Sequence, residues 1–102
     1  MVELYEETIV DIQSYINKNS GTCNYVNWYV GINKNPIDRL LNNHKIKEKY
    51  DLWIWRQTSS PDIAQKIESY FINILKTDGG TGGGNEGADW VYAYRKNSYT
   101  KP

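Results

Sequence analysis

The chain has 102 residues, and its 12 basic side chains balance its 12 acidic ones at neutral pH. This length is typical of one domain with one hydrophobic core, so we expect residues 1–102 to form a single unit. No apolar run approaches the length of a membrane-spanning helix, roughly 18 residues, and no secretory leader is evident. Cys23 is the single cysteine, which excludes an internal disulfide and favours a reducing compartment. These features predict a soluble cytoplasmic domain without a membrane partner.

The charges are distributed unevenly along the chain. Residues 1–17 carry four acidic side chains and no basic one, whereas residues 33–56 carry six basic side chains against three acidic ones. A basic segment can form a local positive face for phosphate even when the net charge is zero. An ordinary solvated surface would give the same counts, so charge alone leaves nucleic-acid binding open.

The first predicted element is a helix over residues 3–18, because its apolar side chains recur at helical spacing. Gly21 suits the left-handed cap that would end this helix. Residues 25–32 then alternate as a strand does, with Trp28 and Val30 on one face. Tyr29 lies on the other face, which carries more polar residues.

Two further helices are predicted from the same N-terminal signal, an Asn or Ser cap followed by proline. Asn35-Pro36 begins the first of them, and Asn42-Asn43 is its expected end. Ser60-Pro61 begins the second, whose apolar stripe continues to Leu75. Between these helices, residues 52–55 indicate a strand that is covered on both faces or central in the sheet. Residues 90–94 form the last predicted strand.

Residues 78–87 form a loop with six glycines in ten positions. The loop lacks the Gly-Lys-Ser/Thr ending of a phosphate-binding P-loop, which excludes that interpretation. Ordering so many glycines costs conformational entropy, which favours a close approach of the backbone to a ligand such as phosphate. Plain disorder of the loop is the alternative.

The predicted order is helix, strand, helix, strand, helix, strand. Regular alternation of this kind normally favours a parallel sheet. Short connections and the resemblance described next favour an α+β fold instead, with a small, mainly antiparallel or mixed three-stranded sheet flanked by helices.

One segment of the chain resembles the second half of the signature of the GIY-YIG nuclease superfamily. In that family a Tyr-(Ile/Val)-Gly strand leads through an Asn-rich turn into a helix with an arginine ten residues after the tyrosine. Here Tyr29-Val30-Gly31 precedes Arg39 at that spacing. A glutamate on the next helix and a later asparagine complete the family's catalytic set, and Glu68 and Asn85 fall in those places. The resemblance covers residues 26–94 and implies the GIY-YIG fold.

The resemblance also implies hydrolysis of phosphodiester bonds in DNA or RNA with one divalent cation, Mg²⁺ or Mn²⁺. By this analogy Glu68 would bind the metal, Arg39 would contact the phosphate, and Tyr29 would act as a general base or orient water. Such a reaction needs an activated water, charge neutralisation at the phosphorus and protonation of the leaving oxygen. A hard carboxylate with several waters suits Mg²⁺. We therefore expect these side chains and Asn85 to line one cleft.

The chain departs from the family pattern at two positions. The family's first tyrosine lies on a strand about ten residues before the second, where this chain has Lys18 or Asn19 instead of a strand tyrosine. The family also commonly has a His or Tyr four residues after the arginine. Here His44 follows Arg39 by five residues, which places it about 140° away on a regular helix. His44 would reach the site if the helix ends before it, and would otherwise pack against the core.

Structural roles remain as alternatives for the other candidates. Glu68 lies at the edge of the apolar stripe of its helix, where a metal ligand or an ordinary exposed glutamate would both be found. Tyr29 on a sheet is often a packing residue.

The leading hypothesis is a metal-dependent nuclease with an altered first strand. The second is a binding module without turnover, whose partner is a nucleic acid, a nucleotide or a protein such as a defence or repair factor. A purely structural or oligomerisation domain is the third.

Overall fold

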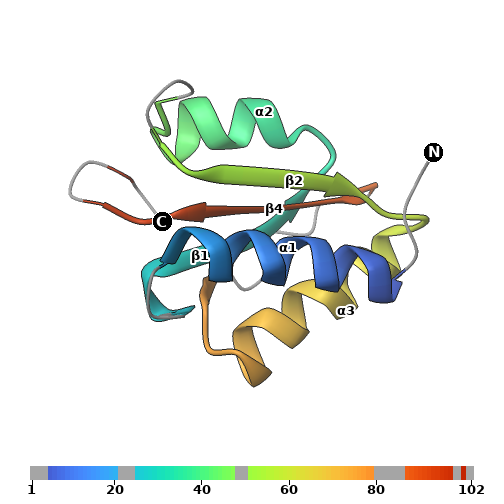
Figure 1. The fold of residues 1–102 in the computed structure, drawn as a ribbon. Coiled ribbons are helices and arrows are strands. Elements are labelled where there is room, and N and C mark those ends of the chain that lie inside the picture. The colour runs from blue at the N-terminus through green and yellow to red at the C-terminus, as the bar shows by residue number, and fades with distance from the viewer. Residues whose placement is uncertain (1–4, 21–24, 48–50, 80–86, 98–99, 101–102) are drawn as a thin grey trace.

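The computed structural model describes residues 5–20, 25–47, 51–79, 87–97 and 100. The fold is α+β, with a four-stranded mixed sheet flanked by helices (Figure 1). The strands are β1 (Trp28–Asn33), β2 (Trp53–Gln57), β3 (Asp78–Gly79) and β4 (Trp90–Arg95). The helices are α1 (Tyr5–Ser20), α2 (Pro36–Asp38) and α3 (Pro61–Ser69). The predicted fold class is confirmed, and β3 adds a fourth strand to the three that were expected.

The order of the strands in the sheet is β2-β4-β1-β3, so the last strand in the chain lies between the first two. β4 pairs antiparallel with β1 from Trp28↔Arg95 to Asn33↔Trp90, and antiparallel with β2 on its other side. β3 pairs parallel with β1. β2 is consequently an edge strand, which corrects the alternative that residues 52–55 form a central one.

Helices α1 and α3 cover one face of the sheet (Figure 1). Because side chains alternate along a strand, every second residue of β1, β2 and β4 points to these helices. The resulting core consists of Ile12, Ile16, Trp28, Val30, Ile32, Ile54, Ala64, Ile67, Phe71, Ala88, Val91 and Ala93. Each large apolar side chain buried here contributes roughly 1.5–3 kcal/mol. Among the described residues, no helix is long and apolar enough to cross a membrane.

Helix α2 and the segment after it cover the opposite face, where a second cluster consists of Tyr29, Leu40, Ile46, Tyr92 and Tyr94. Three of these five residues are tyrosines from the two central strands. The face of β1 that looked more polar in the sequence is therefore buried as well. This second cluster contains the candidate site.

The predicted signals for the starts of α2 and α3 are confirmed. The side chain of Asn35 accepts a hydrogen bond from the backbone N–H of Asp38 (3.4 Å), and that of Ser60 accepts one from Ile63 (3.2 Å). Proline follows each cap, where its missing donor costs nothing. The beginning of the first strand differs from the prediction, because residues 25–27 form a 3₁₀ turn before β1. Gly21 and its expected cap lie outside the described residues.

Helices α2 and α3 both continue into π-helical turns, Arg39–Asn43 and Tyr70–Ile74. After each turn the chain reverses at a lysine with positive φ, 63° at Lys45 and 66° at Lys76. The two ends are closed in the same way, since the backbone N–H of Ile46 donates to Leu40 (3.0 Å) and that of Thr77 to Phe71 (3.0 Å). In a π turn each N–H bonds to the carbonyl five residues earlier, so the turn holds one residue more than an α turn.

Candidate functional site

Tyr92 on β4 lies at the centre of the site. It faces Gly31 of β1 in the antiparallel register, and its side chain is 1% exposed. A Cβ atom at Gly31 would lie 2.5 Å from the Tyr92 hydroxyl oxygen and 2.6 Å from Cζ. The ring of Tyr92 therefore crosses β1 at the one position in that strand that has no side chain. This close approach accounts for the glycine in Tyr29-Val30-Gly31.

Tyr29, the first predicted site residue, is buried next to this position. Its ring stacks on Tyr94 with centroids 5.2 Å apart and on Tyr92 at 6.3 Å, and the His44 ring lies 4.6 Å away. Both the predicted site role and the packing role are compatible with this position, because Tyr29 belongs to the cluster that surrounds the Tyr92 hydroxyl.

His44 bridges the two tyrosines of β4. Its Nε2 atom lies 2.8 Å from the Tyr92 hydroxyl, and its Nδ1 atom lies 3.1 Å from the Tyr94 hydroxyl. The ring is 2% exposed. His44 is thus a core residue that also lies next to the candidate site. The sequence had left a site role and a core-packing role as alternatives, and this position is compatible with both.

The π turn explains how His44 reaches this place from a position five residues after Arg39. The backbone N–H of His44 donates to the carbonyl of Arg39 (2.9 Å), which is the π spacing. Because a π turn accommodates one extra residue, the fifth residue takes the place that the fourth would have on an α-helix. The angle of about 140° expected for a regular helix does not apply here.

Arg39 begins the π turn and is partly buried. Arg39 lies near enough to Tyr92 and Tyr94 to affect the pKa values of both hydroxyls. Burial raises the pKa of Tyr92, the nearby Tyr29 raises it further, and a hydrogen bond and the positive charge of Arg39 oppose these effects. Burial also raises the pKa of Tyr94, and the charge of Arg39 again opposes the increase. Arg39 therefore lies close enough to the Tyr92 hydroxyl for its positive charge to act on it.

Glu68 lies on α3, on the other side of the sheet from Arg39, yet its negative charge raises the pKa of Tyr92. Its Oε2 atom is buried and has no hydrogen-bond partner among the described residues. Burial raises the pKa of the Glu68 carboxyl to about 7. A buried carboxylate oxygen without a partner is costly, and a bound cation would remove that cost.

The site contains two residues that the sequence analysis missed, Tyr92 and Tyr94. The available signal was a pair of tyrosines two positions apart in a predicted strand, which places both on one face. The pairing of β4 with β1 brings Tyr92 beside the YVG segment, and that pairing spans most of the chain. Tyr92 thus stands on the strand next to Tyr29, although it follows Tyr29 in sequence instead of preceding it.

Two of the predicted side chains contact Tyr92, since His44 lies 2.8 Å from its hydroxyl and the Tyr29 ring stacks on its ring. The charges of Arg39 and Glu68 both act on Tyr92, but from opposite sides of the sheet, so the described residues do not confirm the expected single cleft lined by Arg39 and Glu68 together. Asn85, the fifth, lies outside the described residues, and so does most of the glycine-rich loop. Within the described part of the chain, no group of three or more His, Cys, Asp and Glu side chains is placed to hold a metal ion. A cation at Glu68 would take its other ligands from water and phosphate, which is the usual coordination of Mg²⁺.

The predicted basic segment only partly remains available for phosphate. Arg56 lies with Nε 3.3 Å from the Asp11 carboxylate on α1, so the acidic and basic segments meet there. Lys34, Lys45 and Lys47 are exposed. These lysines precede and follow the helical segment that carries Arg39, so exposed positive charge lies at both ends of that segment.

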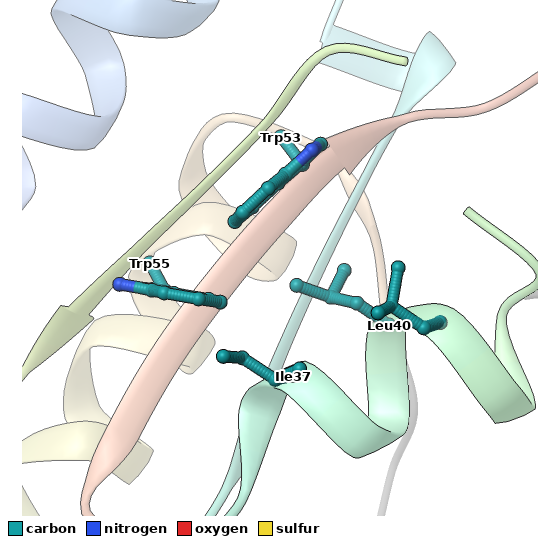
Figure 2. Close-up of a pocket in the computed structure, with 5 residues that line it drawn as sticks. Ile37, Leu40, Trp53 and Trp55 are labelled. Carbon is teal, nitrogen blue, oxygen red and sulfur yellow. The ribbon is translucent and has the colours of Figure 1, made fainter. Parts of the chain in front are cut away.

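A small apolar hollow lies on the same side of the sheet. Figure 2 shows the rings of Trp53 and Trp55 extending from β2 toward Ile37 and Leu40 on the α2 side. The two indoles are 4.8 Å apart and only partly buried. The hollow contains only about 10 Å³ of accessible space, which is room for about one water molecule and far below the roughly 300 Å³ at which ligand pockets begin. It therefore cannot enclose a base or a nucleotide.

No family model, curated protein or solved structure matches this chain. The resemblance to the GIY-YIG signature therefore rests on the residues and spacings described above.

Proposed function

We propose that this chain hydrolyses phosphodiester bonds in DNA or RNA with a GIY-YIG-type site. The observation that supports the proposal is the contact of His44 with the Tyr92 hydroxyl, with Tyr29 stacked beside it. The charges of Arg39 and Glu68 both act on Tyr92 as well. The proposed location is the cytoplasm, and the proposed partner is a nucleic acid rather than a membrane.

Arg39 supplies positive charge for the phosphate. A guanidinium offers donors in a planar fork that matches phosphate oxygens, and it remains charged at any working pH. Charge that develops on the phosphorus in the transition state would be stabilised most by a donor held in place beforehand. The partly buried position of Arg39 at the start of the π turn provides that preorganisation.

Tyr29 and Tyr92 supply hydroxyl groups for orienting the attacking water. Burial raises the pKa of Tyr92 well above its ordinary value, so its hydroxyl remains neutral at physiological pH. A neutral phenol both donates and accepts a hydrogen bond, which allows it to hold water in a defined direction. His44 lies 2.8 Å from the Tyr92 hydroxyl. Histidine is the side chain whose ordinary pKa lies closest to neutral pH, so it can exchange a proton with its neighbours there.

Glu68 is the proposed ligand of Mg²⁺ or Mn²⁺. Its buried oxygen without a partner suits one direct bond to a hard cation,. When bound, the cation would polarise the phosphate and stabilise negative charge on the leaving oxygen. Without a cation, the pKa of about 7 leaves this carboxyl partly protonated at neutral pH.

The proposal is tested with labelled single-stranded and double-stranded DNA and RNA, each incubated with the purified chain and Mg²⁺ or Mn²⁺. Cleavage should require the metal and should be lost in Glu68→Gln. The matched control is Glu7→Gln, which changes an exposed glutamate on α1 and should cleave as the wild type does. Equal cleavage by both variants would remove Glu68 from the metal site.

A binding module without turnover is the second candidate, and the tryptophan hollow on β2 is the observation that favours it. Partly exposed indoles provide stacking surfaces for bases at roughly 1–3 kcal/mol per base. This candidate predicts that the chain binds a labelled oligonucleotide, that Trp55→Ala weakens binding, and that no cleavage occurs with either metal. Cleavage by the wild-type chain would reject it.

A further inference from the structure

Tyr94 has no role in the proposed reaction, although its side chain is completely buried and its hydroxyl meets a site residue. The hydroxyl lies 3.1 Å from Nδ1 of His44, while Nε2 of the same ring lies 2.8 Å from the Tyr92 hydroxyl. His44 is therefore held at both nitrogens by side chains of one strand, two residues apart. Such an arrangement fixes the position of the ring and also which of its two nitrogens carries the proton.

The hydrogen-bond capacities of these three side chains limit how the protons are arranged. Burial raises the pKa of Tyr92 and of Tyr94, so each hydroxyl retains its proton at neutral pH. A neutral imidazole carries one N–H donor and one acceptor nitrogen. One tyrosine must then donate to His44, and the other must accept from it.

The two distances at His44 distinguish the arrangements. Hydroxyl donors make shorter hydrogen bonds than N–H donors, roughly 2.7–2.8 Å against roughly 2.9–3.0 Å. The 2.8 Å contact at Nε2 therefore fits a proton donated by the Tyr92 hydroxyl, and the 3.1 Å contact at Nδ1 fits an N–H donated to the Tyr94 oxygen.

We propose that Tyr94 is a positioning residue that holds the proton of His44 on Nδ1, so that Nε2 is kept free to accept the hydroxyl proton of Tyr92. This inference rests on the proposed function for its catalytic meaning, but the proton arrangement itself can be measured without any substrate.

The arrangement provides a path for the proton of the attacking water. As the water oxygen bonds to phosphorus, the bond from phosphorus to the leaving oxygen breaks, and that oxygen departs with the bonding electron pair and takes a proton from solvent water. The O–H bond of the attacking water breaks at the same time, and its proton passes to the Tyr92 oxygen. The original Tyr92 proton passes at the same time to Nε2 of His44, which becomes an imidazolium with Nδ1–H donated to Tyr94. Neither tyrosine becomes an anion, which is required because burial opposes the charged form of both.

The groups that face His44 all belong to elements already described. Tyr29 of β1 lies against the ring, Arg39 begins the preceding turn, and Tyr92 and Tyr94 contact the two nitrogens. Glu68 acts on Tyr92, and Asp78 of β3 acts on Tyr94. A change in the protonation of any of these groups would therefore change the pH dependence of the reaction.

The proton arrangement is tested by ¹⁵N NMR of the imidazole, which is unambiguous because the chain contains one histidine. We expect a protonated Nδ1 and an acceptor Nε2 in the wild-type chain near pH 7.5, and a shift toward Nε2–H in Tyr94→Phe. A wild-type ring protonated on Nε2 would overturn the inference, and this measurement needs no variant. An unchanged tautomer in a folded Tyr94→Phe would overturn it as well.

The catalytic consequence is tested by kinetics on whichever nucleic acid the wild type cleaves. Tyr94→Phe should lower kcat by about a hundredfold with little change in KM, which is the lower end of a lost general-base contribution, and should shift the pH dependence of kcat. Tyr70→Phe, at the start of the π turn that follows α3, removes a hydroxyl from the other face and should leave kcat unchanged. An unchanged kcat and pH profile in Tyr94→Phe would overturn the positioning role. Absence of wild-type cleavage would reject the proposed function, while the NMR result would still decide the tautomer.

Discussion

The ring of Tyr92 occupies the space beside Gly31 that any larger residue would need. A Cβ atom there would lie 2.5 Å from the hydroxyl oxygen. The hydroxyl is the far end of its side chain, but it is bonded to His44 at 2.8 Å and the ring is 1% exposed. The ring therefore has little freedom to move aside.

Gly31→Ala should consequently destabilise the chain by about 1–3 kcal/mol, the usual cost of overpacking a core. Urea denaturation of the wild type and the variant measures this difference. In a Tyr92→Leu background the ring is absent, so the same substitution should cost less than half as much. Equal costs in the two backgrounds would show that Tyr92 is not the obstacle.

The buried carboxyl of Glu68 predicts a specific dependence of stability on pH. Its pKa in the folded chain is about 7, and the ordinary value of an unfolded glutamate is about 4.3. The folded state thus holds the proton more tightly, and the stability from this group is complete below about pH 4.3 and is lost as the pH rises through about 7.

Glu68→Gln should therefore be about 1–3 kcal/mol more stable than the wild type at pH 8, after allowance for partial solvent exposure, and close to it at pH 4. Chemical denaturation at the two pH values without divalent cations measures the difference. Glu7→Gln on α1 serves as the control and should show no such trend. A constant difference between Glu68→Gln and the wild type at both pH values would contradict a raised pKa.

Arg39→Lys should reduce cleavage by about a hundredfold, because lysine lacks the planar fork that binds phosphate at two oxygens. Initial rates at saturating substrate measure the loss. Arg56→Lys is the matched control, since Arg56 is occupied with Asp11 at 3.3 Å on the opposite side of the sheet. If both lysine variants lose activity equally, the effect comes from general charge and not from the site.

The π turn predicts an unusual tolerance to deletion. Removing the exposed Asn42 would place His44 four residues after Arg39, which is the α-helical spacing for the same face. His44 should then remain beside Tyr92, whereas insertion of one alanine at the same point should displace it. The ¹⁵N signals of the single histidine report both outcomes, and displacement in the deletion variant would show that the extra residue is needed.

Local signals in the sequence were sufficient for the helix starts and for much of the strand pattern. Asn35 and Ser60 act through hydrogen bonds to residues three positions away. The helix starts that they form can therefore be predicted from the local sequence alone. The family signature predicted Tyr29, Arg39 and Glu68 as site residues, and it predicted His44 only as a residue displaced by one position from the family spacing.

The remaining parts of the site depend on contacts between distant segments. Tyr92 meets Gly31 because β4 inserts between β1 and β2, and no local pattern specifies that order. His44 reaches the tyrosines through a π turn, and Leu40 in that turn and Ile46 after it pack in the same buried cluster as the tyrosines. β3, with its two residues, is too short to give a strand pattern at all.

The most direct measurement of the central claim is the single-turnover cleavage rate of a labelled oligonucleotide by excess chain. The account predicts cleavage with Mg²⁺ or Mn²⁺, none with a chelator, and losses of at least about a hundredfold in Glu68→Gln and Arg39→Lys, while Glu7→Gln and Arg56→Lys retain the wild-type rate. Metal-independent cleavage, or a Glu68→Gln variant as fast as the wild type, would contradict it.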